Sequence, residues 1–435
     1  MSKLLNDNSR CNVKGLFSVS PMLFFILLFI FIFLLTGNIY KISLSVVFTI
    51  SCVYALYTLK NRSITERIKV FSRGAGQENL MLMLWIFVLA GAFAQTAKDI
   101  GAIDAVVRVA LHFLPSHLIL AGLFVTACFV SLSIGTSVGT VAALVPIATG
   151  IATSTGQPTA MLVAAVVGGA FFGDNLSFIS DTTIASTKTQ GCELKDKFKA
   201  NFLIVLPAAI ITVIIYIFTN SQSQYSTEIT AIDYIKMLPY IIILVSAICG
   251  MNVFVVLAVG NLLSGITGMA LGVCNMEDWF VSAGNGIMSM GELIIISMLA
   301  GGMLEVIREN GGIEYIINKL SSHIHSKRGG ELIIGAMVGI TNLCTANNTI
   351  AILSVGKIAK SISTRFRINP CKAASILDTF SCVVQGLIPY GAQFLIASGL
   401  SHVQPTNILP YIYYPVIVGI TAIIGIIIRY PKKYS

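Results

Sequence analysis

The chain has 435 residues, of which 55% are hydrophobic and 11% are charged. Soluble proteins carry roughly 25% charged residues, so this composition excludes an ordinary soluble domain and predicts an all-α polytopic membrane protein. The net charge of +9 could suggest a nucleic-acid partner. However, the basic residues are grouped between apolar runs, so we expect a lipid bilayer as partner and no nucleic acid. The nine cysteines include no CxxC pair, and we expect no enzymatic activity and no resident cofactor.

Apolar runs of about 20 residues, the length that crosses a ~30 Å hydrocarbon core, recur along the chain. The first run exceeds the ~7 to 15 residues of a secretory signal core, so it is expected to remain as a transmembrane helix. The clearest predicted crossings are 17 to 37, 42 to 59, 79 to 97, 200 to 219, 237 to 257, 286 to 306 and 408 to 428.

The distribution of Lys and Arg predicts the topology, because cytoplasmic loops retain basic residues. Basic residues concentrate in the N-terminus and in 60 to 73, 188 to 199, 308 to 328, 357 to 372 and 429 to 433. The loops predicted on the other side lack Lys and Arg: 149 to 158, 220 to 235, 274 to 284 and 401 to 408. We therefore expect a bacterial cytoplasmic (inner) membrane protein with both termini in the cytoplasm.

Residues 117 to 148 must enter and leave the membrane on the same side if both flanking loops lie outside. Two full crossings need about 40 residues plus a turn, so this segment is expected to form a re-entrant hairpin. Its tip would be the polar run SIGTSVGT, 133 to 140.

An internal repeat relates the two halves of the chain. LAGAFAQTAKDIGAIDAVV (89 to 107) matches LAGGMLEVIRENGGIEYII (299 to 317), 210 residues later (299 − 89 = 210). The basic loops that follow are on opposite sides in the two copies, which predicts two inverted-topology repeats, the architecture of secondary transporters. The predicted organisation is an N-terminal helix pair (1 to 78), repeat 1 (79 to 219), linking helices (220 to 285), and repeat 2 with a last helix (286 to 435).

Each copy has two polar interruptions, where non-helical backbone is tolerated only around protein or a water-filled cavity. The hairpin tips are 133 to 140 and 341 to 349. The broken helices are 158 to 187, interrupted at GDNLSFISD, and 373 to 400, interrupted at QGLIPYGAQ. Oxygen ligands for a small cation are expected from Ser177, Ser180 and Thr182, and from Thr136, Ser137, Thr140, Asn342, Thr345, Asn347, Asn348 and Gln385. Any single Ser or Thr among them can instead hydrogen-bond to its own helix.

Buried acids are the strongest functional candidates, because a charged carboxylate at membrane depth costs roughly 2.5 to 3.5 kcal/mol on insertion scales. Asp174 is the first choice for a group that holds a proton and exchanges it for a cation. Asp181 is the second, with an N-cap of the restarting helix as an almost equal alternative. Asp378 is the acid inside the equivalent crossing of the second copy, and we expect it to be a further proton or cation group.

These motifs resemble the NhaC-type Na+/H+ antiporters of the ion transporter superfamily. GAFFGDNLSFISDTT is similar to that family's GxxFGDxxSxxSDTT, GTSVGT to its GTSxGT, and the LIPY run before residue 391 to its LIPW segment. The resemblance implies inverted repeats, alternating access, and exchange of Na+ for H+ at Asp174 and Asp181. Asn175 and Phe178 stand where the family commonly has Lys and Pro.

The leading hypothesis is therefore a Na+(Li+)/H+ antiporter in which a transported Na+ and a proton compete at Asp174. The alternative is a Na+- or H+-coupled exchanger of small carboxylates or amino acids of the malate/lactate type. An intramembrane aspartyl protease is disfavoured because Asp174 and Asp181 share one crossing. A homodimer is a possible assembly.

Overall fold

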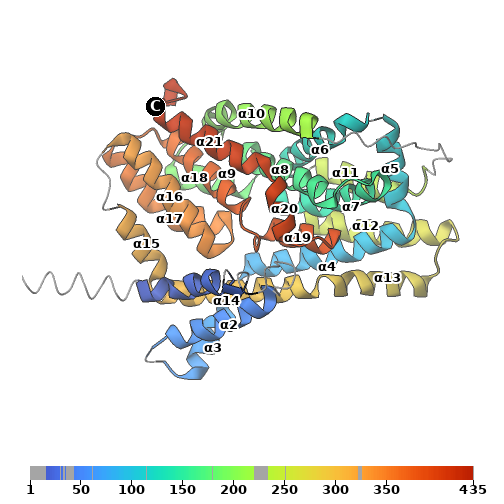
Figure 1. The fold of residues 1–435 in the computed structure, drawn as a ribbon, viewed down its shortest axis with the longest axis horizontal. Coiled ribbons are helices and arrows are strands. Elements are labelled where there is room, and N and C mark those ends of the chain that lie inside the picture. Colours follow the sequence, from blue (N-terminus) through green and yellow to red (C-terminus); the bar gives the residue numbers. More distant parts are fainter. Residues whose placement is uncertain are drawn as a thin grey trace, which may run out of the picture.

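The computed structural model describes residues 16–29, 31, 32, 35, 44–60, 62–113, 115–178, 180–219, 234–249, 251–321 and 326–434. Every regular element in this part of the chain is a helix. Figure 1 shows two layers, with α2, α3, α4, α13 and α14 along the lower side and α10, α16, α18 and α21 above them. The all-helical membrane fold expected from composition is confirmed.

The first half of the chain begins with a helix over Leu16–Phe29. It continues through α2 (Leu44–Thr58), α3 (Ile64–Ala75), α4 (Glu78–Asp99), α5 (Ala102–Phe113), η2 (Ser116–Leu118), α6 (Ile119–Ile134), α7 (Ser137–Thr155), α8 (Thr159–Leu176), α9 (Asp181–Gln190) and α10 (Leu194–Thr219).

The second half runs in a similar order. Its elements are α11 (Leu238–Ile248), α12 (Val253–Ala270), α13 (Met276–Ser289), α14 (Gly291–Glu309), α15 (Gly312–Ser321), α16 (Lys327–Thr345), α17 (Asn348–Arg365), α18 (Pro370–Gln385), α19 (Ala392–Ser401), α20 (Pro405–Ile408), η3 (Leu409–Tyr411), α21 (Tyr413–Ile427) and η4 (Lys432–Tyr434).

Several helices of the described part can cross a membrane. Six are long and apolar enough, or seven when the bent pair Pro405–Tyr411 and Tyr413–Ile427 is counted as one span. The predicted crossings at 79 to 97 and 200 to 219 are confirmed as helical, and α2 covers nearly all of the described part of 42 to 59. The crossing predicted at 286 to 306 includes the end of α13 and most of α14, which meet at Met290 in one span. Part of the first predicted crossing, 17 to 37, lies outside the described residues.

Three boundary predictions were wrong. The crossing predicted at 237 to 257 is two helices, α11 and α12, separated near Met251. The loop predicted at 149 to 158 is largely helical, because α7 continues past Pro146 and Gly150 and ends only where Gly156 takes a φ of 69°. The loop predicted at 274 to 284 forms α13, which starts at a capping box between Asn275 and Asp278. Most of the predicted loop 220 to 235 lies outside the described residues.

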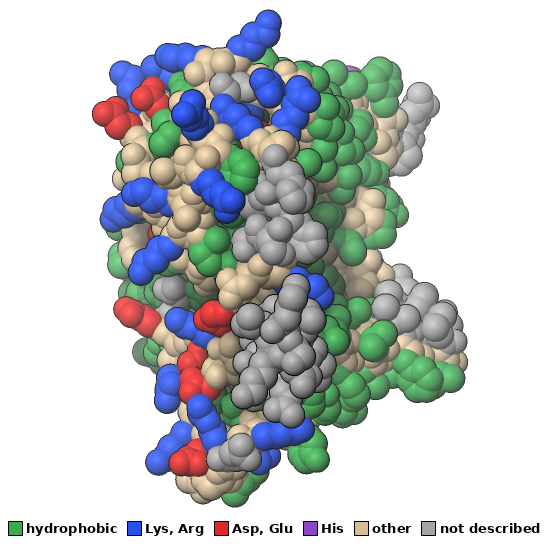
Figure 2. Space-filling model, turned by 90° about the vertical axis from the view of Figure 1, so that its left-hand side faces the viewer, with side chains coloured by type: hydrophobic (Ala, Val, Ile, Leu, Met, Phe, Trp, Pro, Cys, Tyr) green, Lys and Arg blue, Asp and Glu red, His purple; other side chains and the backbone are tan. Residues whose placement is uncertain are grey.

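The basic segments gather at one end of the molecule. Figure 2 views the left-hand side of Figure 1, and Lys and Arg side chains cover much of this face. The C-terminus and α15 lie at the same side in Figure 1. Two lysines counted as loop charges do not belong to this solvated set, since Lys197 and Lys372 are buried. The predicted loop 188 to 199 ends too late, because α10 already begins at Leu194.

The helix boundaries repeat along the chain at a spacing of 211, one residue more than the spacing of 210 between the matching sequence segments. α6 ends at Ile134 and α16 at Thr345 (345 − 134 = 211), while α7 begins at Ser137 and α17 at Asn348 (348 − 137 = 211). The α9 and α19 starts have the same separation. The two halves therefore share one order of helices, and their opposite orientation in the membrane stays a prediction.

Reciprocal helix crossings explain why the repeat keeps Leu-Ala-Gly at 89 to 91 and 299 to 301. α13 packs on α4, and α14 packs on α3. A Cβ atom at Gly286 would lie 2.2 Å from the carbonyl oxygen of Gly91, and one at Gly74 would lie 2.3 Å from that of Gly301. These distances are far below van der Waals contact, so only glycine allows the two backbones to meet, as in close packing of membrane helices.

The substitution Gly286→Ala tests this crossing. The added methyl group must push α13 away from α4, and we expect a loss of about 1–3 kcal/mol of stability. Gly284→Ala on the same helix is the matched control, because a Cβ there meets nothing within 4 Å. Thermal unfolding of purified protein in detergent should show a lower midpoint for Gly286→Ala and an unchanged or higher midpoint for Gly284→Ala. Equal midpoints for both variants would contradict the crossing.

Candidate functional site

Two short turns mark the predicted hairpin tips. In the first, Gly135 takes φ 75° and Thr136 is extended before α7 begins at Ser137. In the second, Ala346 takes φ 47° and Asn347 is extended before α17 begins. Both tips therefore have the same geometry, a left-handed residue followed by an extended residue, as the sequence placed them. Whether each hairpin re-enters the membrane on one side stays a prediction.

The two predicted helix breaks lie in the expected crossings. α8 ends at Leu176 and α9 begins at Asp181, whereas α18 ends at Gln385 and α19 begins at Ala392. The first break is shorter than GDNLSFISD, because the helix continues through Asp174 to its last turn. The carboxylate therefore projects from helical backbone, beside the break rather than within it.

Asp174 is buried, with 4% of its surface exposed. Its carboxylate accepts two hydrogen bonds from the start of α7, from the Ser137 amide to Oδ1 (3.0 Å) and from the Ser137 hydroxyl to Oδ2 (2.5 Å). Both donors are neutral, and none of the ion pairs found among the described residues involves Asp174. A buried carboxylate without a cationic partner strongly favours a proton or a bound cation.

A chain of hydrogen bonds joins this carboxylate to the second half of the protein. Gln393, in the first turn of α19, donates from Nε2 to the Ser137 hydroxyl (2.8 Å). Gln385 donates from Nε2 to Gln393 Oε1 (3.1 Å) and to the carbonyl of Ala346 (3.0 Å). The two tips and the two breaks thus meet in one polar network around Asp174.

A cavity of about 440 Å³ adjoins the network. It follows α9 to Lys188, α17 to Leu353, and the first turns of α4, each in the direction of a basic segment. Asp181, the first residue of α9, is exposed in it, with Ser180 at the N-cap position. The predicted site residues that line the cavity are Thr136, Ser137, Asp174, Ser180, Asp181, Thr182, Asn347, Asn348 and Gln385.

The predicted oxygen ligands divide by their hydrogen bonds. Thr182 donates to the main-chain carbonyl of Asp174 (3.1 Å) and lies 2.9 Å from the Ser180 hydroxyl. Asn347 caps α17 through its side-chain oxygen. Asn348 contacts the Cys382 sulfur through Nδ2. These residues shape the cavity wall next to Asp174.

The remaining predicted ligands are not among the described residues that line the cavity. They donate to backbone carbonyls: Ser177 to Leu132, Thr140 to Thr136, Asn342 to Ser381 and Thr345 to Asn347. Such bonds hold the turns and breaks in shape, which is the ordinary role of hydroxyl and amide groups in membrane helices.

Asp378 lies on α18, outside the cavity lining and behind the first break. Its Oδ2 accepts from the ammonium of Lys197 on α10 (2.5 Å) and from the amide of Asn201 (2.9 Å). Both members of the ion pair are buried. The structure therefore places Asp378 beside a lysine, and its role as a proton or cation group stays a prediction.

Sequence reasoning missed Gln393, Lys197 and Asn201. Gln393 ends the quoted run QGLIPYGAQ, and it lies 211 residues after Thr182 (393 − 182 = 211), so the repeat spacing could have found it. Lys197 and Asn201 begin a buried stripe on α10 that continues through Ile204, Ala208 and Thr212. Polar residues at helical spacing on the buried face of a helix were the available signal.

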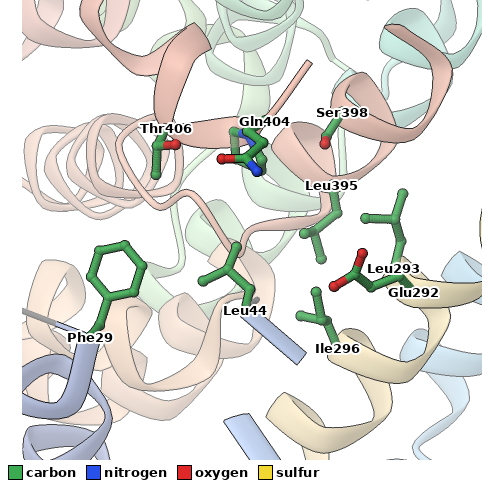
Figure 3. Close-up of a pocket in the computed structure, with 10 residues that line it drawn as sticks. Phe29, Leu44, Glu292, Leu293, Ile296, Leu395, Ser398, Gln404 and Thr406 are labelled. Carbon is green, nitrogen blue, oxygen red and sulfur yellow. The ribbon is translucent and has the colours of Figure 1, made fainter. Parts of the chain in front are cut away.

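A second, smaller cavity lies between α14, α19 and residues 404–406. Figure 3 shows the Glu292 carboxylate at its edge among the apolar side chains Leu44, Leu293, Ile296 and Leu395. Glu292 is exposed, and its Oε1 accepts from the Ser45 hydroxyl (2.9 Å). This acid is solvated and partnered, so the cavity lacks the buried, uncompensated charge found at Asp174.

The sequence matches the Na+/H+ antiporter family over residues 12–221 and 223–428. The chain belongs to this family. Members transport Na+ and H+ by antiport, and the resemblance to NhaC-type proteins expected from the motifs is confirmed. The chain is thus a multi-pass membrane protein of a cation/proton antiporter family.

Two curated relatives have informative names. The chain is 25% identical over 398 residues to the Na(+)/H(+) antiporter NhaC of Bacillus subtilis, covering 82% of this chain and 85% of the relative. It is 18% identical over 385 residues to the Malate-2H(+)/Na(+)-lactate antiporter of the same organism, covering 80% and 82%. Among solved structures, the YdaH transporter of Alcanivorax borkumensis matches with a TM-score of 0.44 and 11% identity, over 89% of this chain and 99% of that one.

Ser137→Ala tests how firmly the network is built around Asp174. The substitution removes one donor to the carboxylate and the acceptor for Gln393, so buried polar atoms lose their partners at an expected cost of about 1–3 kcal/mol. Ser133→Ala is the matched control on the preceding helix, since that hydroxyl bonds only to the carbonyl of Phe129 in its own helix. Thermal unfolding in detergent measures both. A loss for Ser133→Ala as large as that for Ser137→Ala would contradict the network.

Proposed function

We propose that the protein is a Na+(Li+)/H+ antiporter in which the cation and the proton compete at Asp174. The observation that carries the proposal is the buried Asp174 carboxylate, which is held by two neutral donors where both tips and both breaks meet. A proton or a Na+ ion neutralises this charge equally well, and each excludes the other.

The surroundings of Asp174 suit a small monovalent cation. The oxygen-bearing residues Thr136, Ser137, Ser180, Thr182 and Asn348 line the same cavity. Asp174 is the one buried carboxylate among the described residues of the cavity and its direct partners are neutral, which matches one Na+ better than a divalent ion. The described residues contain no group of three or more His, Cys, Asp or Glu side chains that could hold a metal ion.

The position of the cavity and the repeat of the helix order support alternating access. The cavity extends from Asp174 along α9 and α17 toward basic segments that we assign to the cytoplasm of a bacterial inner membrane. This conformation is inward-facing, with Asp181 at the entrance. Movement of one inverted repeat against the other would close this cavity and open a path from Asp174 to the opposite side of the membrane, as in other secondary transporters.

The substitution Asp174→Asn is the direct test. It keeps the size of the side chain but removes the charge, and an amide nitrogen replaces one of the two oxygens that accept hydrogen bonds from Ser137. Neither a proton nor Na+ is then needed to neutralise the site. In everted vesicles we expect Na+-dependent proton release to fall to the level of vesicles without the protein. Glu193→Gln, at an exposed acid outside the cavity lining, is the control, and it should retain most of the activity. Unchanged exchange by Asp174→Asn would sink the assignment.

A coupled exchanger of small carboxylates is the second candidate. Lys188 and the amides of Asn347, Asn348 and Gln393 line the cavity, and they could bind a carboxylate. One relative is named for malate and lactate. Proton flux in proteoliposomes with Na+ alone, and with Na+ plus malate, lactate or arginine, separates the candidates. Exchange driven by Na+ alone supports the proposal, whereas an absolute requirement for an organic acid supports the alternative.

Thiol labelling tests the assigned direction of the cavity. In a cysteine-free protein, Asp181→Cys should react with a membrane-impermeant maleimide in everted vesicles, because Asp181 is exposed in the cavity that we assign to the cytoplasmic side. Thr153→Cys, at the exposed end of α7, is the matched control and should react in right-side-out vesicles. The opposite pattern would reverse the topology and leave the chemistry at Asp174 untouched.

A further inference from the structure

Behind the first break, Lys197 fills a small chamber made of oxygen atoms. Its ammonium donates to Asp378 Oδ2 (2.5 Å), to the Thr183 hydroxyl (2.7 Å) and to the main-chain carbonyl of Asn175 (2.9 Å). These three bonds use all three hydrogens of the ammonium. One carboxylate, one hydroxyl and one carbonyl are also the oxygen types that bind Na+ at broken membrane helices.

The chamber is closed and rigid. Lys197 is 1% exposed and Asp378 is 0% exposed. Asn201 fixes two of the three oxygens, because its Nδ2 donates to Asn175 O (2.9 Å) and to Asp378 Oδ2 (2.9 Å). Its own oxygen accepts from the hydroxyls of Ser375 and Thr379. The oxygens are thus held in place by groups other than the lysine.

The other carboxylate oxygen of Asp378, Oδ1, has no hydrogen-bond partner among the described residues. This oxygen is buried, and the Thr182 hydroxyl is near the carboxylate. The position has no acidic mate in the other repeat, since residue 167, at the same spacing of 211 (378 − 211 = 167), is Val167. The Lys197–Asp378 ion pair therefore has no acidic counterpart in the first half. The helix arrangement that the two halves share does not require it.

We propose that the chamber of Asp378, Thr183 and Asn175 is a second cation site that the Lys197 ammonium occupies permanently. The lysine supplies a fixed positive charge from α10, where a transported ion would otherwise bind. Lys197 thereby restricts the protein to one exchangeable cation, and the Asp174 carbonyl next to the chamber is held by Thr182 and Thr183 regardless of transport.

The test removes the resident charge and counts bound ions. Lys197→Ala leaves Asp378 buried without a cationic partner, since Asn201 donates only a neutral hydrogen bond, and an uncompensated buried charge strongly favours recruitment of a cation. Equilibrium dialysis of purified protein with radioactive Na+, balanced with choline at alkaline pH, gives the number of Na+ ions per chain. We expect one for the wild type, two for Lys197→Ala, and one again for Lys197→Ala combined with Asp378→Asn. Lys195→Ala, an exposed lysine on the same helix, is the matched control and should bind one.

The same assay separates this inference from the proposed function, on which its consequence for transport rests. Asp174→Asn should bind no Na+, while Asp174→Asn combined with Lys197→Ala should bind one, at the chamber. A gain of one ion in Lys197→Ala with no loss in Asp174→Asn would refute the function of Asp174 but keep the chamber. A loss in Asp174→Asn with no gain in Lys197→Ala would overturn the chamber alone.

The thermal stability of Lys197 variants in the presence of different cations gives a second test of the chamber. Lys197→Ser, which adds a hydroxyl oxygen to the chamber, is measured in parallel. For both variants, Na+ should raise the midpoint of thermal unfolding more than it does for the wild type, and ethylammonium, a small analogue of the missing group, should do the same. Absence of any cation-dependent stabilisation in both variants, or failure to recover either one in Na+, counts against an ion-filled chamber.

Discussion

A helix broken inside a membrane leaves backbone groups that lipid cannot satisfy, and this constraint governs the centre of the protein. Two carbonyls at the first break have side-chain donors: Asp174 O from Thr182 and Thr183, and Asn175 O from Lys197 and Asn201. At the second tip, Gln385 donates to Ala346 O and Tyr390 to Leu343 O. Two of these donors, Thr182 and Gln385, also line the cavity beside Asp174. The residues that satisfy the broken backbone therefore overlap with the cavity wall, and both halves of the chain contribute to it.

The helix frame is repeated but the chemistry is not. Tips and breaks recur at a spacing of 211, and the glycine crossings Gly74–Gly301 and Gly286–Gly91 are reciprocal. At the spacing of 211, however, Asp174 corresponds to Gln385 (385 − 174 = 211). A carboxylate in one half and an amide in the other give a network with one negative charge instead of two. One charge at the meeting point can be neutralised by one proton or one monovalent cation, whereas two close carboxylates would repel each other and demand more.

The sequence predicted most of this frame and part of the site. Tips, breaks and the buried Asp174 were predictable because membrane depth makes polar and helix-breaking residues conspicuous. The end of α7 at Thr155 was not, since an absence of charge between two apolar runs does not stop a helix. Gln393 and Asn201 lie on helices whose register, and therefore whose facing partners, only tertiary packing decides. Lys197 was misread because a lysine near a basic loop looks solvated until the helix is seen to begin at Leu194.

Lys197 also bears on the Asn175 position, where this chain differs from the family's motif. Family members commonly carry a lysine directly after the aspartate, and this chain has Asn175 there. The structure brings a positive charge to the same place from another helix, with the Lys197 ammonium 2.9 Å from the carbonyl of Asn175. The charge forms its ion pair with Asp378 and not with Asp174. A lysine anchored behind the break donates to the broken backbone without forming an ion pair with the carboxylate in front of it, so Asp174 keeps only the neutral donors of Ser137.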